Sequence, residues 1–189
     1  MTISERKQEV RTKQITVNRS ISADILEQSS RMIFRNLCIL PVFQNCHSVF
    51  SYVSCYGEIS TFPILRYLLK TGKKVTVPKC ISPGIMEARV IQSLDDLKPG
   101  KFGILEPPDD SEILVSPELC LLPCIACTAD GIRLGHGGGY YDRYLAKHPE
   151  MHRVILAGSW QILDALPYEP FDIRCEYIVS EISQGGFHP

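Results

Sequence analysis

The sequence lacks an excess of charge of either sign, because its 189 residues hold 20 lysines and arginines against 21 aspartates and glutamates. Proteins that bind the phosphate backbone of nucleic acid carry a broad basic surface, which this composition does not supply. The sequence also lacks an apolar run of the ~18 to 20 residues that a membrane span needs. Residues 1–14 are polar and charged rather than apolar as in a secretory signal. We therefore expect a cytoplasmic protein that binds neither nucleic acid nor membrane.

Internal repeats and low-complexity tracts are also missing, and a chain of this length fits one domain with one active site. We expect a single domain over residues 1–189, acting as a monomer. The eight cysteines lack the density of a short secreted disulfide scaffold, so we expect reduced thiols. Cys120, Cys124 and Cys127 include a CxxC pair, but no second pair stands at zinc-binding spacing. They are predicted to be buried thiols.

Apolar periodicity and chain breakers predict alternating helices and strands. Helices are expected at residues 3–15, 22–38, 61–72 and 141–148. Strands are expected at residues 47–54, 73–79, 119–127, 152–158 and 176–181, with a further short strand at 86–90 inside an excursion over 80–118. The order strand, helix, strand is a βαβ unit, and the nearly continuous apolar run at 119–127 is typical of a strand buried on both faces. The pattern predicts an α/β fold with a mostly parallel sheet.

A glycine-rich stretch follows that buried run directly. "GIRLGHGGGYYDRYL", residues 131–145, places glycine at 135, 137, 138 and 139. Glycines let the backbone approach a phosphate closely, and the free N–H groups at a helix start favour an anion. The spacing matches neither GxxxxGK[ST] nor GxGxxG. From the residues alone, a phosphate site and a tight structural turn both stay open.

The side chains around these glycines suit phosphate chemistry. Arg133 and Arg143 can clamp phosphate oxygens, Tyr140 and Tyr141 can stack on a ring or donate hydrogen bonds, and Asp142 can hold Mg²⁺. Each also has a structural interpretation, because an acid near a helix start is favourable without metal, arginines are often solvated, and tyrosines often pack half-buried.

The stretch "LLPCIACTADGIRLGHGGGYYDRYL", residues 121–145, closely resembles the signature of the 5-formyltetrahydrofolate cyclo-ligase family, also called methenyltetrahydrofolate synthetase. Weaker matches to the family follow in order along the chain. They are "KQEVR" at 7–11, "YGEIST" at 56–61, "GKKVTVP" at 72–78, "FGILEP" at 102–107 and "WQILDALPYEPFD" at 160–172. The resemblance covers nearly the whole chain.

The resemblance implies a three-layer α/β/α sandwich related to the NagB/RpiA/CoA-transferase group. It implies an ATP- and Mg²⁺-dependent ligase of one-carbon metabolism that converts 5-formyltetrahydrofolate to 5,10-methenyltetrahydrofolate and releases ADP and phosphate. The γ-phosphoryl group would move onto the formyl oxygen, and the N10 amine would then close the ring. Positioning and charge neutralisation carry such a transfer. Alternatives are a non-catalytic nucleotide- or folate-binding relative, and, by fold analogy alone, a sugar-phosphate isomerase.

The resemblance also implies roles for individual positions. The residues implied to bind ATP are Lys7, Arg11, Arg133, Leu134, Gly135, His136, Gly137, Gly138, Gly139, Tyr140 and Tyr141. Of these, Lys7, Arg133 and Tyr141 are implied to be catalytic. Those implied to bind the folate are Glu58, Gly137, Gly139 and Tyr140, and Asp142 and Asp172 would hold Mg²⁺. The structural alternatives are a solvated helix face for Lys7 and Arg11, a turn or cap residue for Glu58, and a loop acid for Asp172.

Four positions depart from the family pattern. Ser60 lies where many members have an acidic residue, Phe171 where a His or Asn is common, and Gly158 where an aromatic residue is frequent. Trp160, two residues after Gly158, can supply the missing ring. Gly138 replaces a lysine that some members use, which leaves cations elsewhere in the chain to meet the phosphates. None of these departures removes a residue assigned to ATP or metal.

Overall fold

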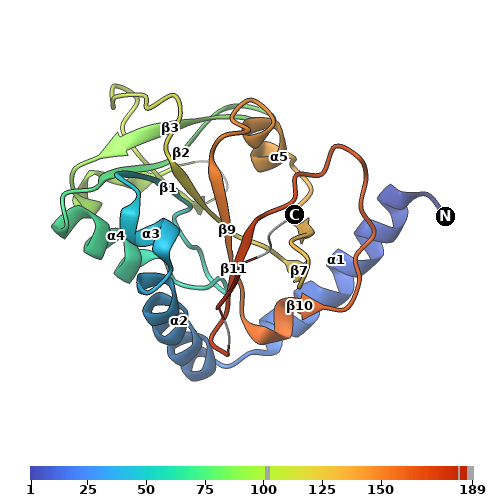
Figure 1. Ribbon diagram of the computed structural model, residues 1–189. Helices are drawn as coiled ribbons and strands as arrows, with labels where there is room; N and C mark the ends of the chain where they lie inside the picture. Colours follow the sequence, from blue (N-terminus) through green and yellow to red (C-terminus); the bar gives the residue numbers. More distant parts are fainter. Residues whose placement is uncertain (101–102, 183, 187–189) are drawn as a thin grey trace.

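The computed structural model describes residues 1–100, 103–182 and 184–186. Its centre is a seven-stranded sheet in the order β12-β11-β9-β6-β1-β2-β3 (Figure 1). The strands are β1 (Ser48–Ser51), β2 (Lys74–Ser82), β3 (Ile85–Ile91), β6 (Leu119–Leu122), β9 (His152–Leu156), β11 (Tyr177–Val179) and β12 (Gln184–Gly186). The five inner strands run parallel, and β3 and β12 pair antiparallel at the two edges. The predicted mostly parallel α/β fold is confirmed.

Helices cover both faces of this sheet, as Figure 1 shows. They are α1 (Ile3–Ser20), α2 (Ala23–Cys38), α3 (Pro41–Asn45), α4 (Phe62–Lys70) and α5 (Tyr140–Leu145). Side chains alternate along the strands, so that Val49 packs with α2, α3 and α4 while Phe50 packs on the α5 side. The molecule therefore has three layers, helices, sheet and helix, as the family resemblance implied.

The first two helices begin where the sequence places caps. Ser22 caps α2, since its hydroxyl accepts a hydrogen bond from the backbone N–H of Ile25 at 3.3 Å. Thr2 and Glu5 form a capping box at the start of α1. The prediction of α2 is confirmed, but α1 extends to Ser20 rather than ending at residue 15. No glycine or proline interrupts it, and Asn18 anchors the added turn by donating to the carbonyl of Ile125 at 3.1 Å.

The prediction of one strand over residues 119–127 is wrong. The run divides into β6, in the main sheet, and β7 (Ala126–Thr128), in a small sheet of order β10-β7-β8 with β8 (Arg133–Leu134) and β10 (Ile162–Leu163). Pro123 stands at the break, where it has no N–H to continue the ladder. The small sheet packs against α1 through Leu134 and Val10, and this packing brings the glycine stretch beside α1.

Other predicted elements are present with different ends. The strands expected at 47–54, 152–158 and 176–181 are shorter, because the chain leaves the ladder before the β-rich stretch of sequence ends. The helix expected at 141–148 spans Tyr140–Leu145, and that expected at 61–72 spans Phe62–Lys70. The strand expected at 73–79 continues to Ser82 and turns back as β3, which contains the short strand expected at 86–90.

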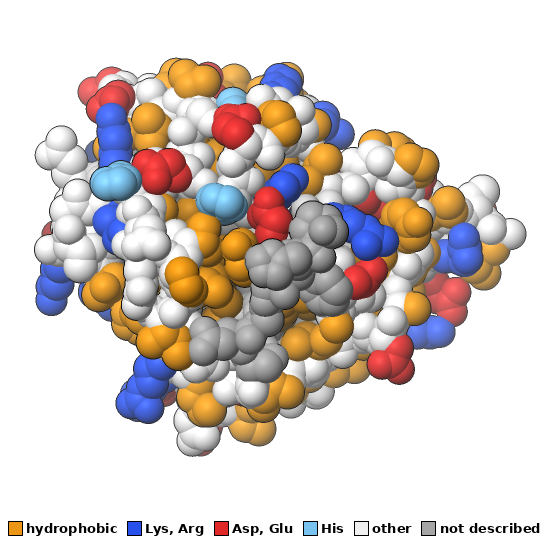
Figure 2. All heavy atoms as spheres, in the orientation of Figure 1, with side chains coloured by type: hydrophobic (Ala, Val, Ile, Leu, Met, Phe, Trp, Pro, Cys, Tyr) orange, Lys and Arg blue, Asp and Glu red, His pale blue; other side chains and the backbone are white. Residues whose placement is uncertain are grey.

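The 80–118 excursion adds a short antiparallel pair, β4 (Lys98–Pro99) with β5 (Leu105–Glu106). Figure 2 shows acidic and basic side chains interspersed over one face of the molecule. Among the residues that the structure describes, no helix has the length and apolar character needed to span a bilayer.

Candidate functional site

The glycine stretch forms an open loop between β8 and α5. Gly137 and Gly139 adopt positive φ angles of 94° and 66°, in a region that side chains disfavour. His136, Gly137 and Gly138 are exposed, so their backbone is accessible to a ligand. Because α5 has only six residues, its dipole is small, and most of the attraction for an anion must come from cations nearby.

Arg11 brings the first such cation from α1. Its Nε donates to the carbonyl of Gly135 at 2.8 Å, and its guanidinium carbon lies 3.5 Å from where a Cβ on Gly137 would stand. Burial lowers the pKa of Arg11, while the charges of Asp172, Asp142 and Glu169 act to raise it. These contacts place Arg11 against the glycine loop rather than on a solvated helix face.

Lys7, one helical turn earlier, is only 7% exposed and is also not part of a solvated face. Its ammonium lies 2.7 Å from a carboxylate oxygen of Glu169 and 2.5 Å from one of Asp172. Asp172 also accepts a hydrogen bond from the backbone N–H of Glu169 at 2.7 Å. Burial lowers the pKa of Lys7, but hydrogen bonds and charges from the two acids outweigh it, and the net pKa is raised.

This raised pKa predicts a pH-dependent contribution to stability. A group whose pKa is higher in the folded than in the unfolded protein stabilises the fold fully at pH values below its unfolded-state pKa, which is 10.5 for lysine. That stabilisation is lost as the pH rises through the folded-state pKa. We expect the difference in unfolding free energy between wild type and Lys7→Met to be constant from about pH 7 to about pH 10 and to shrink above that. Urea unfolding at a series of pH values measures it. A difference that grows with alkaline pH would contradict the assignment.

Arg133 enters the site from β8 and is almost completely buried, with 3% of its side chain exposed. Its Nη2 lies 3.1 Å from Asp142, and its Nη1 donates to the carbonyl of Pro123 at 3.3 Å. Its Nε is buried without a hydrogen-bond partner among the described residues. Burial opposes the charge, but Asp142 and neighbouring groups outweigh it and raise the pKa of Arg133. An unsatisfied buried donor beside the loop fits an anionic ligand.

Tyr141, on α5, and Glu58, in the turn after β1, lie on either side of the loop's contacts with the rest of the site. The Tyr141 ring packs on Phe50 at 6.1 Å, and burial, with the charges of Cys120 and Glu58, holds the pKa of its hydroxyl well above the ordinary value. Tyr141 is therefore a hydrogen-bond donor at neutral pH. Glu58 accepts from the N–H of Cys55 at 2.9 Å, as a turn residue does, and its other oxygen lies 3.6 Å from His136.

Two aromatic rings occupy space that glycines leave open. The Tyr140 ring lies 2.8 Å from where a Cβ on Gly138 would stand, so a side chain at 138 would displace it. The Trp160 ring lies 2.4 Å from the corresponding position on Gly158. The Trp160 ring thus occupies the space beside Gly158, and its role in place of the missing ring stays a prediction.

The donor set for a divalent cation consists of two carboxylates, each held by a cation. Asp142 contacts Arg133, and Asp172 contacts Lys7. In the described part of the chain, no group of three His, Cys, Asp or Glu side chains is arranged to hold a metal ion. Mg²⁺ commonly uses one or two carboxylates and completes its shell with phosphate and water oxygens. Asp142 and Asp172 are each of the ligand type that such an ion takes, and the coulombic influence of both on Arg11 places them on the same side of the glycine loop as that residue.

The structure separates several residues from this centre. The Leu134 side chain packs in the core of the small sheet, so it can contribute only its backbone to a ligand. Cys120, Cys124 and Cys127 are buried as predicted. Phe171, by contrast, lies beside the site, because its ring centre is 5.5 Å from Lys7 Nζ although the residue is 67% exposed.

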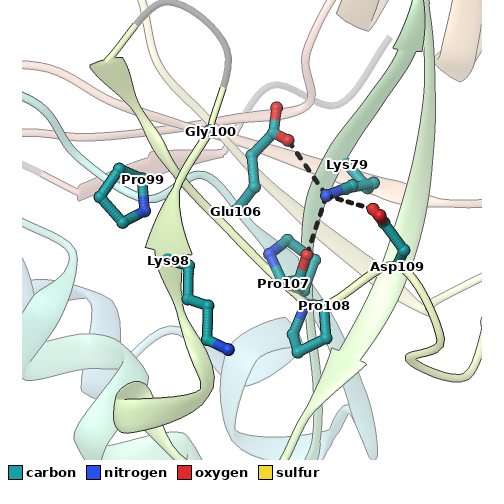
Figure 3. Close-up of a pocket in the computed structure, with 8 residues that line it drawn as sticks. All are labelled: Lys79, Lys98, Pro99, Gly100, Glu106, Pro107, Pro108 and Asp109. Carbon is teal, nitrogen blue, oxygen red and sulfur yellow. Dashed lines mark hydrogen bonds and ion pairs between the residues drawn. The ribbon is translucent and has the colours of Figure 1, made fainter.

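A hollow of about 250 Å³ lies elsewhere, beside the β4–β5 pair (Figure 3). Lys79 lies at its wall and contacts Asp109 at 2.7 Å, Glu106 at 3.4 Å and the carbonyl of Pro107 at 3.1 Å. Its ammonium is therefore satisfied within the protein. The hollow includes part of the "FGILEP" match, whose Phe102 lies outside the described residues, and it holds none of the predicted site residues.

Comparisons with known proteins identify the family of the chain. The profile of the 5-formyltetrahydrofolate cyclo-ligase family matches residues 3–181, which include the glycine loop and both aspartates. The chain belongs to this family. Proteins named probable 5-formyltetrahydrofolate cyclo-ligase, from Schizosaccharomyces pombe and Caenorhabditis elegans, are 33% and 30% identical to it. The first match covers 66% of this chain and 64% of that relative, and the second covers 95% and 94%.

A solved structure of a family member has the same fold. The NMR structure of Aquifex aeolicus 5,10-methenyltetrahydrofolate synthetase superposes with a TM-score of 0.82 at 29% identity, covering 98% of this chain and 93% of that one. A synthetase structure from Mycoplasma pneumoniae, at 19% identity and a TM-score of 0.74, supports the fold. The three-layer architecture described above is thus the family architecture.

One residue of the candidate site escaped the sequence analysis. Glu169 shares Lys7 with Asp172, although only Asp172 was assigned a role. Its position three residues before Asp172, within the family-like stretch 160–172, was the available signal. Spacing alone could not show that both acids meet a lysine from the other end of the chain.

Proposed function

We propose that this chain catalyses the ATP- and Mg²⁺-dependent conversion of 5-formyltetrahydrofolate to 5,10-methenyltetrahydrofolate, with release of ADP and phosphate. The observation that carries the proposal is the convergence of Lys7 and Arg11, from α1, with Arg133 at the glycine loop more than a hundred residues later. Three cations around an accessible, side-chain-free backbone suit a triphosphate.

Phosphoryl transfer to the formyl oxygen requires the site mainly to position the two substrates and to neutralise the charge on the phosphates. Arg11 holds the loop carbonyl of Gly135, and Arg133 has an unused buried donor. Lys7 would move from its two acids to the phosphates. Asp142 and Asp172 would hold Mg²⁺, which supplies charge neutralisation on the phosphate oxygens when bound.

The folate would enter beside Glu58 and the two tyrosines. Tyr141 carries a protonated hydroxyl that can donate to the formyl oxygen or to the incoming phosphoryl group. Tyr140 offers a ring beside Gly138. Gly137 and Gly139 would contribute backbone groups to the folate, because Arg11 and Arg143 fill the space in which side chains at these two positions would stand. Glu58 supplies an acceptor for N–H groups of a pterin, 3.6 Å from His136 on the loop.

A direct assay tests the proposal. Purified protein receives 5-formyltetrahydrofolate, ATP and Mg²⁺, and the rise of methenyl absorbance is followed together with ADP release. We expect both products in equal amounts, and neither without ATP. Binding of ATP and folate without absorbance change would instead identify a non-catalytic relative, the alternative suggested by Ser60, Phe171 and Gly158.

Glu58→Gln tests the folate contact. We expect KM for 5-formyltetrahydrofolate to rise about tenfold with KM for ATP nearly unchanged, because a carboxylate that accepts substrate N–H groups becomes a neutral amide. The amide oxygen can still accept from Cys55, so the turn is retained. Glu112→Gln, in an exposed pair with Lys74, is the matched control. An unchanged folate KM in Glu58→Gln would leave Glu58 a turn residue only.

We also propose that residues 1–189 act as one domain, as a monomer in the cytoplasm. Core residues from α2 through β11 pack in one continuous cluster, from Ile33 to Val179, which supports a single unit. The exposed thiol of Cys55 suits a reducing compartment. Sedimentation at catalytic concentrations measures the oligomeric state, and a dimer would contradict this part of the proposal.

A further inference from the structure

Arg143, on α5, joins two segments that are far apart in the sequence. Its Nε donates to the carbonyl of Gly84, at the tip of the β2–β3 hairpin, at 2.9 Å. Its Nη2 donates to the carbonyl of Gly138 in the glycine loop. Within the described residues, no carboxylate lies at ion-pair distance from Arg143. Its hydrogen bonds therefore go to two backbone carbonyls rather than to an acid.

Two glycines make room for this guanidinium. A Cβ on Gly84, which has a φ of 74°, would stand 1.8 Å from Nη2 of Arg143. A Cβ on Gly139, with a φ of 66°, would stand 2.8 Å from Nη1. Real side chains do not tolerate either distance, so residues 84 and 139 must both lack a side chain for the arginine to lie here.

We propose that Arg143 is a positioning residue that holds the glycine loop in its ligand-binding shape by fastening it to the β2–β3 hairpin. Because a peptide unit is planar, holding the carbonyl of Gly138 also orients the N–H of Gly139. A loop with glycine at four of five positions has many accessible conformations, and ordering them on binding costs entropy. A loop that is already held binds its ligand more tightly. The functional part of this proposal rests on the proposed function.

A competing role for Arg143 is direct contact with phosphate, which would use its charge rather than its shape. Arg143→Lys separates the two roles. Lysine keeps the positive charge, but it lacks the planar guanidinium group whose separate nitrogens donate to the two carbonyls. If Arg143 acts through the backbone, Arg143→Lys and Arg143→Ala should behave alike. If it contacts phosphate, the lysine variant should retain most of the wild-type affinity.

Steady-state kinetics provide the first test. We expect KM for ATP to rise about tenfold in both Arg143→Ala and Arg143→Lys, as for loss of charge-assisted hydrogen bonds, with kcat and the folate KM within about twofold of wild type. Lys147→Ala, which removes an exposed cation just beyond α5, should leave all three constants unchanged. A wild-type KM for ATP in either Arg143 variant would overturn the positioning role.

Amide hydrogen exchange of the free protein provides a test that needs no activity. Both Arg143 variants should exchange faster at the hydrogen-bonded amides next to the two held carbonyls, those around residues 82–85 in the β2–β3 pair and those of residues 143–146 in α5. The remaining amides and the melting temperature should be unchanged. Gly84→Ala should do the same by displacing the guanidinium, and its effect should not add to that of Arg143→Ala. Unchanged exchange in the Arg143 variants would overturn the proposal. Faster exchange in the Arg143 variants, together with a wild-type protein that shows no turnover, would support the positioning role and refute the proposed function alone.

Discussion

Asp142→Asn should lower kcat about a thousandfold while leaving the fold intact. The substitution removes one of two carboxylates proposed to hold Mg²⁺, and the lost charge stabilisation is worth several kcal/mol, of which about 4 kcal/mol corresponds to a thousandfold. Asparagine keeps an oxygen that can accept from Arg133 Nη2, now 3.1 Å from Asp142. The buried arginine therefore keeps a partner. Methenyl absorbance at saturating ATP measures kcat, and a Mg²⁺ titration should show weaker activation.

Asp164→Asn is the matched control, because it removes an exposed acid from the stretch between β10 and Asp172. We expect it to have wild-type activity. Thermal melting of both variants should give wild-type midpoints. Activity in Asp142→Asn within a few-fold of wild type would exclude Asp142 from the metal site and leave it as the partner of Arg133 alone.

Lys7→Met should lower kcat/KM for ATP by a factor on the order of a hundred to a thousand. Lys7 is the most buried cation that α1 brings to the site, and an amine close to transferring phosphates neutralises charge that methionine cannot. Methionine fills much of the same volume, so packing is largely kept. The substitution also leaves Glu169 and Asp172 facing each other without their cation, which disfavours Asp172 in the position proposed for Mg²⁺.

Lys13→Met provides the comparison on the same helix. The Lys13 side chain is 74% exposed and pairs only with Glu9, a contact of little energetic weight. We expect no change in kcat/KM for this variant. If Lys7→Met melts at a lower temperature but binds and uses ATP as wild type does, Lys7 anchors the loop of Glu169 and Asp172 and takes no part in catalysis.

Local patterns account for what could be predicted of the fold. The cap at Ser22 and the apolar spacing up to Leu37 define α2 because both act within a few residues of each other. The run at 119–127 was wrongly predicted as one strand, because the pairing of its residues depends on distant segments rather than on near neighbours. Its apolar residues are buried in two different sheets, and composition does not record which sheet a buried strand joins. The proline at 123 was the local sign of the break.

In the candidate site, too, the features formed by contiguous residues were predicted and the contacts between distant residues were not. The family-like stretch at 131–145 identified the glycine loop, since its residues are contiguous. The partner of Lys7 at position 169 and the bridge from Arg143 to Gly84 were absent from the prediction. The first pair is separated by 162 residues and the second by 59.

The sequence by itself determined the extent of α2, the mostly parallel sheet, the glycine loop and the family. Only the tertiary structure decided that Lys7 lies buried between Glu169 and Asp172, that Arg133 pairs with Asp142, and that Arg143 spans two backbone segments. The physical reason is that capping and periodicity act between near neighbours in the chain, whereas an ion pair between distant segments forms only after the sheet has placed them together.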